Sequence, residues 1–261
     1  MEVLIKEEDV LNLFKIRTNG EKVVNLHKQW FPVLSSPKLA GVVADLMGDG
    51  HLQGFKLWRI DFTSKNIQEL ERFESTIFSL FGVRGKIRPC NGNKFGKTFN
   101  LGINNKLISR ILFLTGVPPG PKVKTKFLIP DWILENKECF RVFTRRLFTC
   151  EGGVSLEGRN SFIEMSMYKS EALLDNGFYF FRQIKDGLER FFDIETMNIF
   201  TLGHNLRMDG IKTIGLKLRI KKLKFLIKFR DEIGFEDSQK QDKLIKAINL
   251  KINNSRWDSI S

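Results

Sequence analysis

Residues 39–54 of the 261-residue chain, LAGVVADLMGDGHLQG, pass from a helical pattern into a strand-like pattern through Gly-Asp-Gly. Ser36 is a favourable N-cap, and Pro37 suits the first helical turn. The apolar residues that follow recur at helical spacing: Leu39, Val42, Val43, Leu46 and Met47. The two glycines stop this helix around Asp49, where the helix macrodipole disfavours a negative charge by about 0.3–1 kcal/mol. The position of Asp49 therefore needs a chemical reason.

The segments after this helix predict strands and helices in alternation. Residues 57–65, LWRIDFTSK, alternate apolar and polar side chains and predict a half-buried strand. Residues 66–83 show the pattern of an amphipathic helix. Residues 84–106 predict a hairpin that turns at NGNKFGK, residues 91–97, and residues 106–117 predict another helix. The order is therefore helix, strands, helix, strands, helix.

The same order returns in the second part of the chain. Residues 138–154, ECFRVFTRRLFTCEGGV, predict a helix that ends at Cys-Glu-Gly-Gly. The remaining segments predict a strand over 160–169, a helix over 170–192, a hairpin over 200–220 that turns at RMDG, and a final helix over 221–235. Asp49 and Glu151 thus lie at matching helix ends, and Lys65 and Lys169 end matching strands. Such a repeat predicts two similar halves.

The repeat gives the domain organisation. We expect an N-terminal extension over 1–35, a first half over 36–116, a linker over 117–137 and a second half over 138–261. Four prolines and a glycine among residues 117–133 oppose regular structure in the linker. Within the extension, to which we assign no chemistry, LIKEEDVLNLF has the pattern of an ordinary helix. Two halves of this kind bury their apolar helix faces and predict an α+β fold.

The charge of the chain favours a polyanionic partner. It has 43 basic and 30 acidic residues, a net charge of +13 and a pI of about 9.7. A charged surface serving only solubility, or a thermophile's surface, is the alternative, but the basic residues interleave with strand patterns, which favours nucleic acid.

The cysteines and the N-terminal segment indicate the cellular compartment in which we expect the protein. The three cysteines contain no C-x-x-C, which argues against a zinc site or a disulfide framework. No apolar run is long enough to span a membrane, and the acids in MEVLIKEEDVLNLFKIR argue against a secretion signal. We expect a protein that is not secreted and that lies in the cytoplasm, associated with the nucleoid, or in an organelle.

The paired helices resemble the two motifs of single-chain LAGLIDADG homing endonucleases. The resemblance rests on VVADLMGDG and TRRLFTCEG, and it covers about residues 36–250. GVPPGPK…IPDWI, and IGF followed by Lys240, resemble segments of archaeal and intein-borne members. The resemblance implies two pseudo-twofold-related αββαββα halves, motif helices packed at their interface, and two sheets that together form a saddle over DNA.

The resemblance also implies a metal-dependent cleavage site. It makes Asp49 and Glu151 ligands of Mg²⁺ or Mn²⁺, a role that would explain an acid at a helix C-terminus. Backbone carbonyls at that end, such as those of Gly48 and Cys150, are further ligand candidates. Bound metal activates water and stabilises the attacking and departing oxygens.

The resemblance gives a catalytic role to a basic residue near the end of the second strand. Lys65 matches that position, and Lys169 matches it by repeat symmetry. Lys169 alternates in phase with the apolar residues of its strand, so a bulge is needed to bring it to the face of Lys65. His51 lies two residues after Asp49, close to the expected site, but a polar strand residue is the plainer interpretation.

The second motif departs from the family pattern at Arg146. Relatives carry small residues where the two helices touch, and Ala44 and Gly48 fit this in the first helix. Arg146 is too large for a tight contact unless it bends away, and we expect it to pair with Asp45. The departure either marks a compensated interface or a loss of activity.

The outward strand positions predict the DNA contacts. A β-ribbon with basic side chains enters the major groove, where arginine or lysine pairs with guanine and others bind phosphate. The candidates that share strand parity are Arg59 and Asp61, then Arg84, Lys86 and Arg88, and in the second half Lys217 and Arg219. Lys122 and Lys240, which follow the last helix of each half, are phosphate-contact candidates, with a simple linker charge as the alternative.

These observations predict a monomeric, site-specific endonuclease of double-stranded DNA that depends on divalent metal. Because the two halves differ, its target is long and asymmetric. The alternatives are an intron-splicing maturase that binds intron RNA, and a DNA-binding regulator that no longer cleaves.

Overall fold

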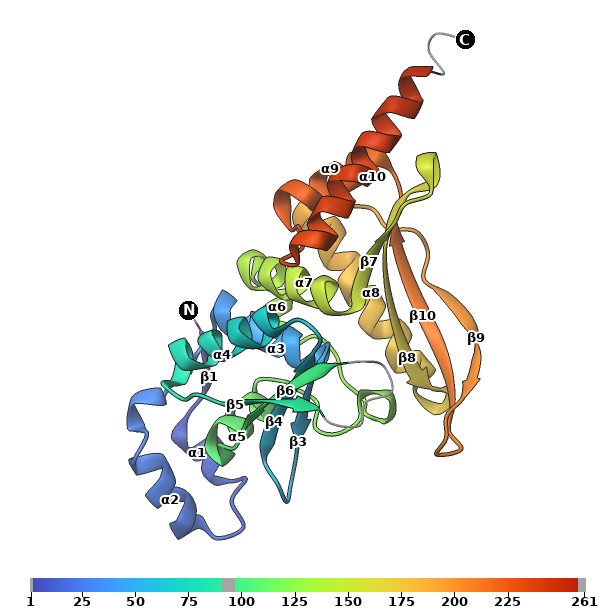
Figure 1. Cartoon of the computed structure of the whole chain (residues 1–261). Coiled ribbons are helices and arrows are strands. Elements are labelled where there is room, and N and C mark those ends of the chain that lie inside the picture. Colours follow the sequence, from blue (N-terminus) through green and yellow to red (C-terminus); the bar gives the residue numbers. More distant parts are fainter. Residues whose placement is uncertain (1, 91–96, 258–261) are drawn as a thin grey trace. The chain divides into compact units, whose positions relative to one another are not determined.

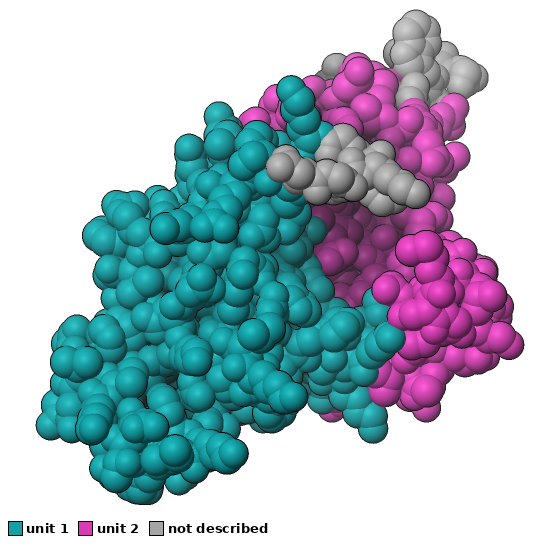
Figure 2. All heavy atoms as spheres, turned by 60° about the horizontal axis from the view of Figure 1, so that its bottom comes forward, with its two compact units in different colours: residues 1–132 teal, residues 133–261 magenta. Residues whose placement is uncertain are grey.

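The structure of the chain is a computed structural model that describes residues 2–90 and 97–257 (Figure 1). The chain divides into two compact units, residues 1–132 and 133–261 (Figure 2). Within the described ranges, no helix is long and apolar enough to cross a membrane. Each unit is built around one four-stranded antiparallel sheet.

Unit 1 begins with the N-terminal extension, which is not one ordinary helix. β1 (Val3–Ile5) pairs with β2 (Val33–Leu34), and only Glu7–Leu11 form α1. The helix starts late because the backbone N–H of Lys6 donates to the carboxylate of Asp9 at 2.7 Å, which fixes the first turn. α2 (Arg17–Asn25) and a short 3₁₀ turn, η1 (Lys28–Trp30), complete the extension.

Arg110 fastens the extension to the rest of unit 1. Its guanidinium carbon lies 4.0 Å from the ring centroid of Phe14 and 4.7 Å from that of Trp58. It also donates to the backbone carbonyls of Leu13 and Lys106, at 3.4 and 2.9 Å. Burial lowers the pKa of Arg110 below its ordinary value. The extension is therefore part of the packed core of unit 1.

The predicted repeat is confirmed in unit 1. Its elements are α3 (Pro37–Met47), β3 (Gly50–Gln53), β4 (Arg59–Ser64), α4 (Ile67–Phe81), β5 (Lys86–Cys90), β6 (Thr98–Ile103) and α5 (Lys106–Leu114). The strands are ordered β3-β4-β6-β5. The Ser36 hydroxyl accepts from the backbone N–H of Leu39 at 3.2 Å, which starts α3 as the sequence predicts. Residues 91–96 of the predicted hairpin turn lie outside the described residues.

The sheet of unit 1 has one apolar and one polar face. Ile60 and Phe62 of β4 and Leu101 and Ile103 of β6 are buried on the side that α3, α4 and α5 cover. The alternate residues form the opposite face, which we call the open face of the sheet. Its cross-strand rows follow from the register: His51, Asp61, Gly102 and Lys86 in one row, and Thr63, Asn100 and Arg88 in the next.

Unit 2 repeats the same order with the same strand arrangement. Its elements are α7 (Lys137–Glu151), β7 (Gly152–Ser155), β8 (Phe162–Ser170), α8 (Leu174–Phe192), β9 (Phe200–Leu206), β10 (Lys212–Ile220) and α9 (Leu223–Glu232). The order β7-β8-β10-β9 matches that of unit 1 element for element. The hairpin turns at RMDG, where Gly210 has φ +77° and Arg207 N–H donates to Ile211. Both halves are therefore αββαββα, as predicted.

Two details of the predicted organisation differ. α9 is not the final helix, because α10 (Ser238–Trp257) follows it and packs against α9 and β7. The proline-rich stretch after α5 contains two short helices, η2 (Lys122–Lys124) and α6 (Asp131–Leu134). Two further 3₁₀ turns, η3 (Gly158–Asn160) and η4 (Glu171–Leu173), flank β8.

Candidate functional site

Asp49 lies just beyond the end of α3. Gly48 caps the helix by donating its backbone N–H to the carbonyl of Ala44 at 2.8 Å, and Asp49 is exposed in the turn to β3. A Cβ at Gly50 would lie 2.6 Å from Leu46 Cδ2 and 2.9 Å from Leu46 Cα. Only glycine lets the first strand double back so closely on the helix, so the turn that presents Asp49 requires Gly50.

Glu151 is presented in the same way in unit 2. It is the last residue of α7, and it is half-buried. A Cβ at Gly152 would lie 2.6 Å from the carbonyl oxygen of Phe148, so glycine is again required directly after the acid. Each half therefore holds one carboxylate at the C-terminal end of its first repeat helix.

Lys122 and Lys240 bind backbone carbonyls beside these two acids. Lys122 Nζ donates to the carbonyl of Gly50 at 3.0 Å. Lys240 Nζ donates to the carbonyls of Thr149 and Gly152, at 2.5 and 2.8 Å. Their positive charge offsets the negative end of each helix. Neither residue is a plain linker charge, and their contact with phosphate stays a prediction.

The two lysines occupy matching positions after the last repeat helix of each half, Lys122 at the start of η2 and Lys240 in the first turn of α10, which the sequence patterns above did not lead us to expect. Gly116 and Gly234 have φ values of +109° and +68° and end the last repeat helix of each half. In both halves the lysine follows its glycine by the same number of residues, because the two segments are GVPPGPK and GFEDSQK. That equal spacing was the available signal.

Lys65 and Lys169 occupy different environments. Lys65 lies just beyond β4 and is exposed. Lys169 is fully buried, and β8 pairs with β10 in unbroken register from Ile163 to Ser170. β8 therefore has no bulge that would turn Lys169 to the face of Lys65. The side chain of Lys169 lies on the helix-covered face of the sheet, beside Gly177 of α8. We correct its assignment accordingly, because a buried lysine on that face does not share the position of Lys65.

His51 is a strand residue that faces Asp61 across β3 and β4. Burial lowers the pKa of His51; the carboxylate of Asp61 opposes this shift and the charge of Lys122 adds to it. His51 is consequently neutral at physiological pH, in keeping with the plainer interpretation.

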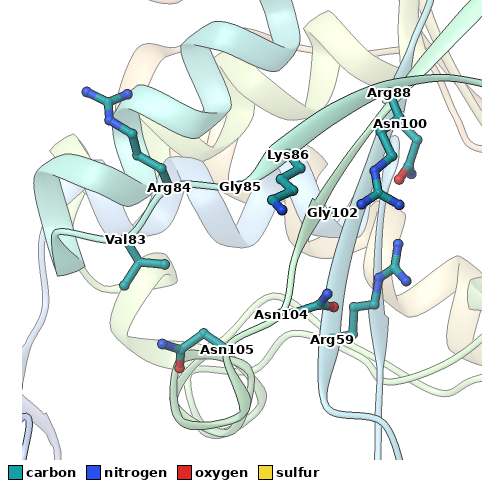
Figure 3. A pocket seen from close by; sticks show the side chains of 10 residues that line it. All are labelled: Arg59, Val83, Arg84, Gly85, Lys86, Arg88, Asn100, Gly102, Asn104 and Asn105. Atoms are coloured by element: carbon teal, nitrogen blue, oxygen red, sulfur yellow. The ribbon is translucent and has the colours of Figure 1, made fainter.

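The open face of unit 1 carries a basic hollow. Figure 3 shows Arg59, Lys86 and Arg88 pointing into it, beside Asn100 and Asn104. Arg59 lies over Gly102, where a Cβ would come within 2.9 Å of its Nη2, and it pairs with Asp61 at 2.7 Å. Asp61 also accepts from Gln53 Nε2 at 2.6 Å. The hollow is lined by cationic and amide side chains that suit phosphate oxygens and base edges.

Arg84 differs from Lys86 and Arg88, although the three share parity. It precedes β5, and in Figure 3 its side chain points away from the other two. Its guanidinium carbon lies 4.1 Å from the ring centroid of Phe78, and its Nη1 lies 3.4 Å from a carboxylate oxygen of Glu74. Arg84 is thus held by α4, and it is a weaker candidate for a DNA contact.

The open face of unit 2 also has a hollow, but its charges are mixed. Lys217 and Arg219 line it together with Glu151, Glu157 and Glu164. Both cations bind Glu164, with Arg219 Nε at 2.5 Å from Oε2. Lys217 and Arg219 therefore lie on the open face, but in this half a carboxylate holds both of them, and their contact with DNA stays a prediction. Glu164 was missed because nothing in its local sequence indicates which residues of β10 it faces.

Asp45 and Arg146 each have an ion-pair partner in their own unit. The fully buried carboxylate of Asp45 binds Nη1 and Nη2 of Arg72 on α4, both at 2.9 Å. Arg146 pairs with Glu236, in the loop between α9 and α10. Both charges are thus compensated locally.

The donor chemistry of the two halves suits a metal that needs few protein ligands. Within residues 2–90 and 97–257, no group of three or more His, Cys, Asp or Glu side chains could hold a metal ion. Mg²⁺ typically binds one or two carboxylates and completes its shell with water and phosphate oxygens, which is compatible with single carboxylates at Asp49 and Glu151. Ligation by the Gly48 and Cys150 carbonyls stays a prediction.

Comparisons with known proteins identify the fold. No protein-family model matches the chain, and no curated protein sequence is similar to it. A solved structure described as the homing endonuclease I-WcaI bound to its DNA recognition sequence is 12% identical, with a TM-score of 0.50 over 86% of this chain and 92% of that chain. The N-terminal LAGLIDADG domain of DUF199/WhiA is 15% identical, with a TM-score of 0.47 over 90% of this chain and 94% of that one. The chain therefore has the α+β fold of a homing endonuclease, with two αββαββα halves.

Proposed function

We propose that this protein is a site-specific, divalent-metal-dependent endonuclease that hydrolyses phosphodiesters of double-stranded DNA. It acts as a monomer on a long target that is asymmetric because the two halves differ. The observation that carries the proposal is the repeated helix end: in both halves an acid precedes a required glycine and lies beside a carbonyl bound by a lysine. A stabilising role alone would not explain the acid in either half, because it lies at the unfavourable end of its helix.

The chain's own residues divide the work in this proposal. Asp49 and Glu151 supply the carboxylates that bind the divalent ions. Such an ion, when bound, activates water and stabilises charge on the reacting phosphate. Lys122 and Lys240 hold the strand starts next to the acids and so fix where the carboxylates point. Lys65, an exposed cation just beyond β4, stabilises the developing charge, and the hollow of unit 1 binds the duplex.

One experiment tests the activity and its alternatives together. The protein is incubated in Mg²⁺ with a library of randomised duplexes and with structured RNA, and both the cut ends and the bound nucleic acids are sequenced. A recurrent long, non-palindromic sequence at the ends supports the proposal. Selective binding without cut ends would instead favour a DNA-binding regulator. Selective binding of structured RNA in place of duplex DNA would favour a maturase.

The basic hollow of unit 1 leads to a prediction about salt dependence. We expect Lys86→Ala with Arg88→Ala to flatten the plot of log affinity against log salt by about 0.9 for each phosphate that the protein no longer neutralises. Arg84→Ala is the matched control and should leave the slope nearly unchanged, since Glu74 and Phe78 already hold that side chain. Affinity measured by fluorescence anisotropy across a salt series checks this. An unchanged slope in the double variant would show that this face does not bind DNA.

Lys65 provides a prediction about rate. We expect Lys65→Met to lower the single-turnover cleavage rate about 10- to 100-fold with little change in affinity, because it removes one cation near the developing charge. Lys65 is exposed, so the substitution should not unfold the protein. A loss of affinity at an unchanged rate would reduce Lys65 to a phosphate anchor.

A further inference from the structure

The two open faces differ in the freedom of their cations. The hollow of unit 1 is lined by Arg59, Lys86 and Arg88 (Figure 3), and of these three cations Arg59 pairs with Asp61 at 2.7 Å. Lys86 and Arg88 are exposed, and no ion pair holds either one within the described part of the chain. In unit 2, both outward cations of β10 are bound to Glu164. The two halves are therefore built for different kinds of contact.

Glu164 holds the two cations of β10 in place. It lies directly across from Arg219 in the register and diagonally from Lys217. The side chains are 20% exposed for Glu164, 19% for Lys217 and 30% for Arg219, so the cluster is largely shielded from water. Burial alone would raise the pKa of Glu164, but the hydrogen bonds from Lys217 and Arg219 bring it below its ordinary value. Glu164 is therefore ionised at neutral pH and keeps both partners.

Two aromatic rings also lie against the guanidinium of Arg219. Its guanidinium carbon lies 4.3 Å from the ring centroid of Phe162 and 4.8 Å from that of Phe200. Nε is directed to Glu164, whereas the two terminal nitrogens make no hydrogen bond to any described residue. A planar pair of donors is thus held rigidly at the sheet surface. This is the arrangement that binds O6 and N7 of guanine in the major groove.

We infer that the two halves divide DNA recognition unequally. The exposed cations Lys86 and Arg88 of unit 1 hold phosphates, and Arg219, positioned by Glu164, reads a guanine edge. Rigid donors lose little conformational freedom on binding, and they discriminate by geometry, whereas flexible cations follow any backbone. The inference rests on the proposed DNA-binding function and adds Glu164 as a positioning residue.

The test uses binding selections on a randomised duplex library with Ca²⁺ in place of Mg²⁺, so that the measured base preferences report binding and do not depend on cleavage. Arg219→Lys keeps the charge but loses the planar pair of donors. We expect the preference for guanine at one position to fall about 5- to 150-fold, with the salt slope unchanged. Arg88→Lys makes the same chemical change at an exposed arginine and should leave every base preference as it is.

Glu164→Gln tests the positioning role, because it should raise the affinity for duplex while it lowers the preference for guanine. The variant keeps the shape of the side chain and removes its charge, which releases Lys217. We expect affinity for scrambled duplex to rise and the salt slope to steepen by about 0.9, while the same guanine preference falls. A residue with only a structural role would lower stability without changing preference at one base pair, and Glu164→Asp should restore that preference in part.

The outcomes separate the inference from the function on which it rests. If the wild-type protein selects no sequence and binds duplex no better than Arg88→Ala, the proposed function and the inference both fail. If the wild-type protein selects a site but Arg219→Lys retains every base preference, the inference alone is overturned. Equal losses of preference in Arg219→Lys and Arg88→Lys would contradict the unequal division.

Discussion

Asp49→Asn and Glu151→Gln are each expected to lower the rate of DNA cleavage by at least about 10³-fold and to leave duplex binding intact. In either variant, the half that carries the substitution loses its charged ligand for the proposed metal ion. Metal ions contribute several kcal/mol to transition-state stabilisation, and each 1.36 kcal/mol is a factor of ten in rate. The measurement is single-turnover cleavage of the selected duplex in Mg²⁺.

Binding and folding controls make this expectation specific. Asp49 is exposed, so its substitution should change the free energy of unfolding by no more than about 0.5 kcal/mol. Affinity in Ca²⁺ should stay the same or increase slightly, because a negative charge near DNA is removed. Glu157→Gln is the matched control for Glu151→Gln, since Glu157 lines the same hollow but lies away from the helix end. Full activity in either acid variant would remove that residue from the site.

The repeat and both acids were predictable because they depend on local signals. Helical and alternating periodicities are properties of short segments, and Ser36 with Pro37 marks a helix start whatever surrounds it. The phase of Lys169 was also a local property, and the unbroken strand register confirmed that it alternates with the buried residues. The α+β fold followed from adding such segments together.

The partners of charged side chains were not predictable in the same way. Lys240 and Thr149 are far apart in the sequence, and only the tertiary packing of the first turn of α10 brings them together. The strand parity of Arg84 suggested a DNA contact, but Glu74 and Phe78 on α4 hold it instead. Choosing between several possible partners depends on tertiary geometry, and sequence spacing carries no such information.

The ion pair between Asp45 and Arg72 should dominate the stability of unit 1. Arg72→Met is expected to lower the free energy of unfolding by about 3–5 kcal/mol, because it takes the bidentate partner from a fully buried carboxylate. The pair joins α3 to α4, and α3 is the helix that leads to Asp49. A loosened α3 should therefore lower cleavage as well as stability. Urea unfolding followed by tryptophan fluorescence reports mainly on this unit, which contains Trp30, Trp58 and Trp132.

Two controls show whether the burial of Asp45 causes the loss of stability that we expect in Arg72→Met. Arg17 makes an equally bidentate pair with Glu8, at 2.7 Å for both contacts, but the side chains are 54% and 57% exposed. Arg17→Met should accordingly lower the free energy of unfolding far less than Arg72→Met does, because solvent screens an exposed pair. Replacing both members of the buried pair, as in Asp45→Leu with Arg72→Leu, should recover much of the stability that Arg72→Met loses, because no unpaired charge is left inside. If Arg72→Met and Arg17→Met cost the same, Asp45 must be solvated or otherwise paired when Arg72 is absent, and α3 is not held by this contact.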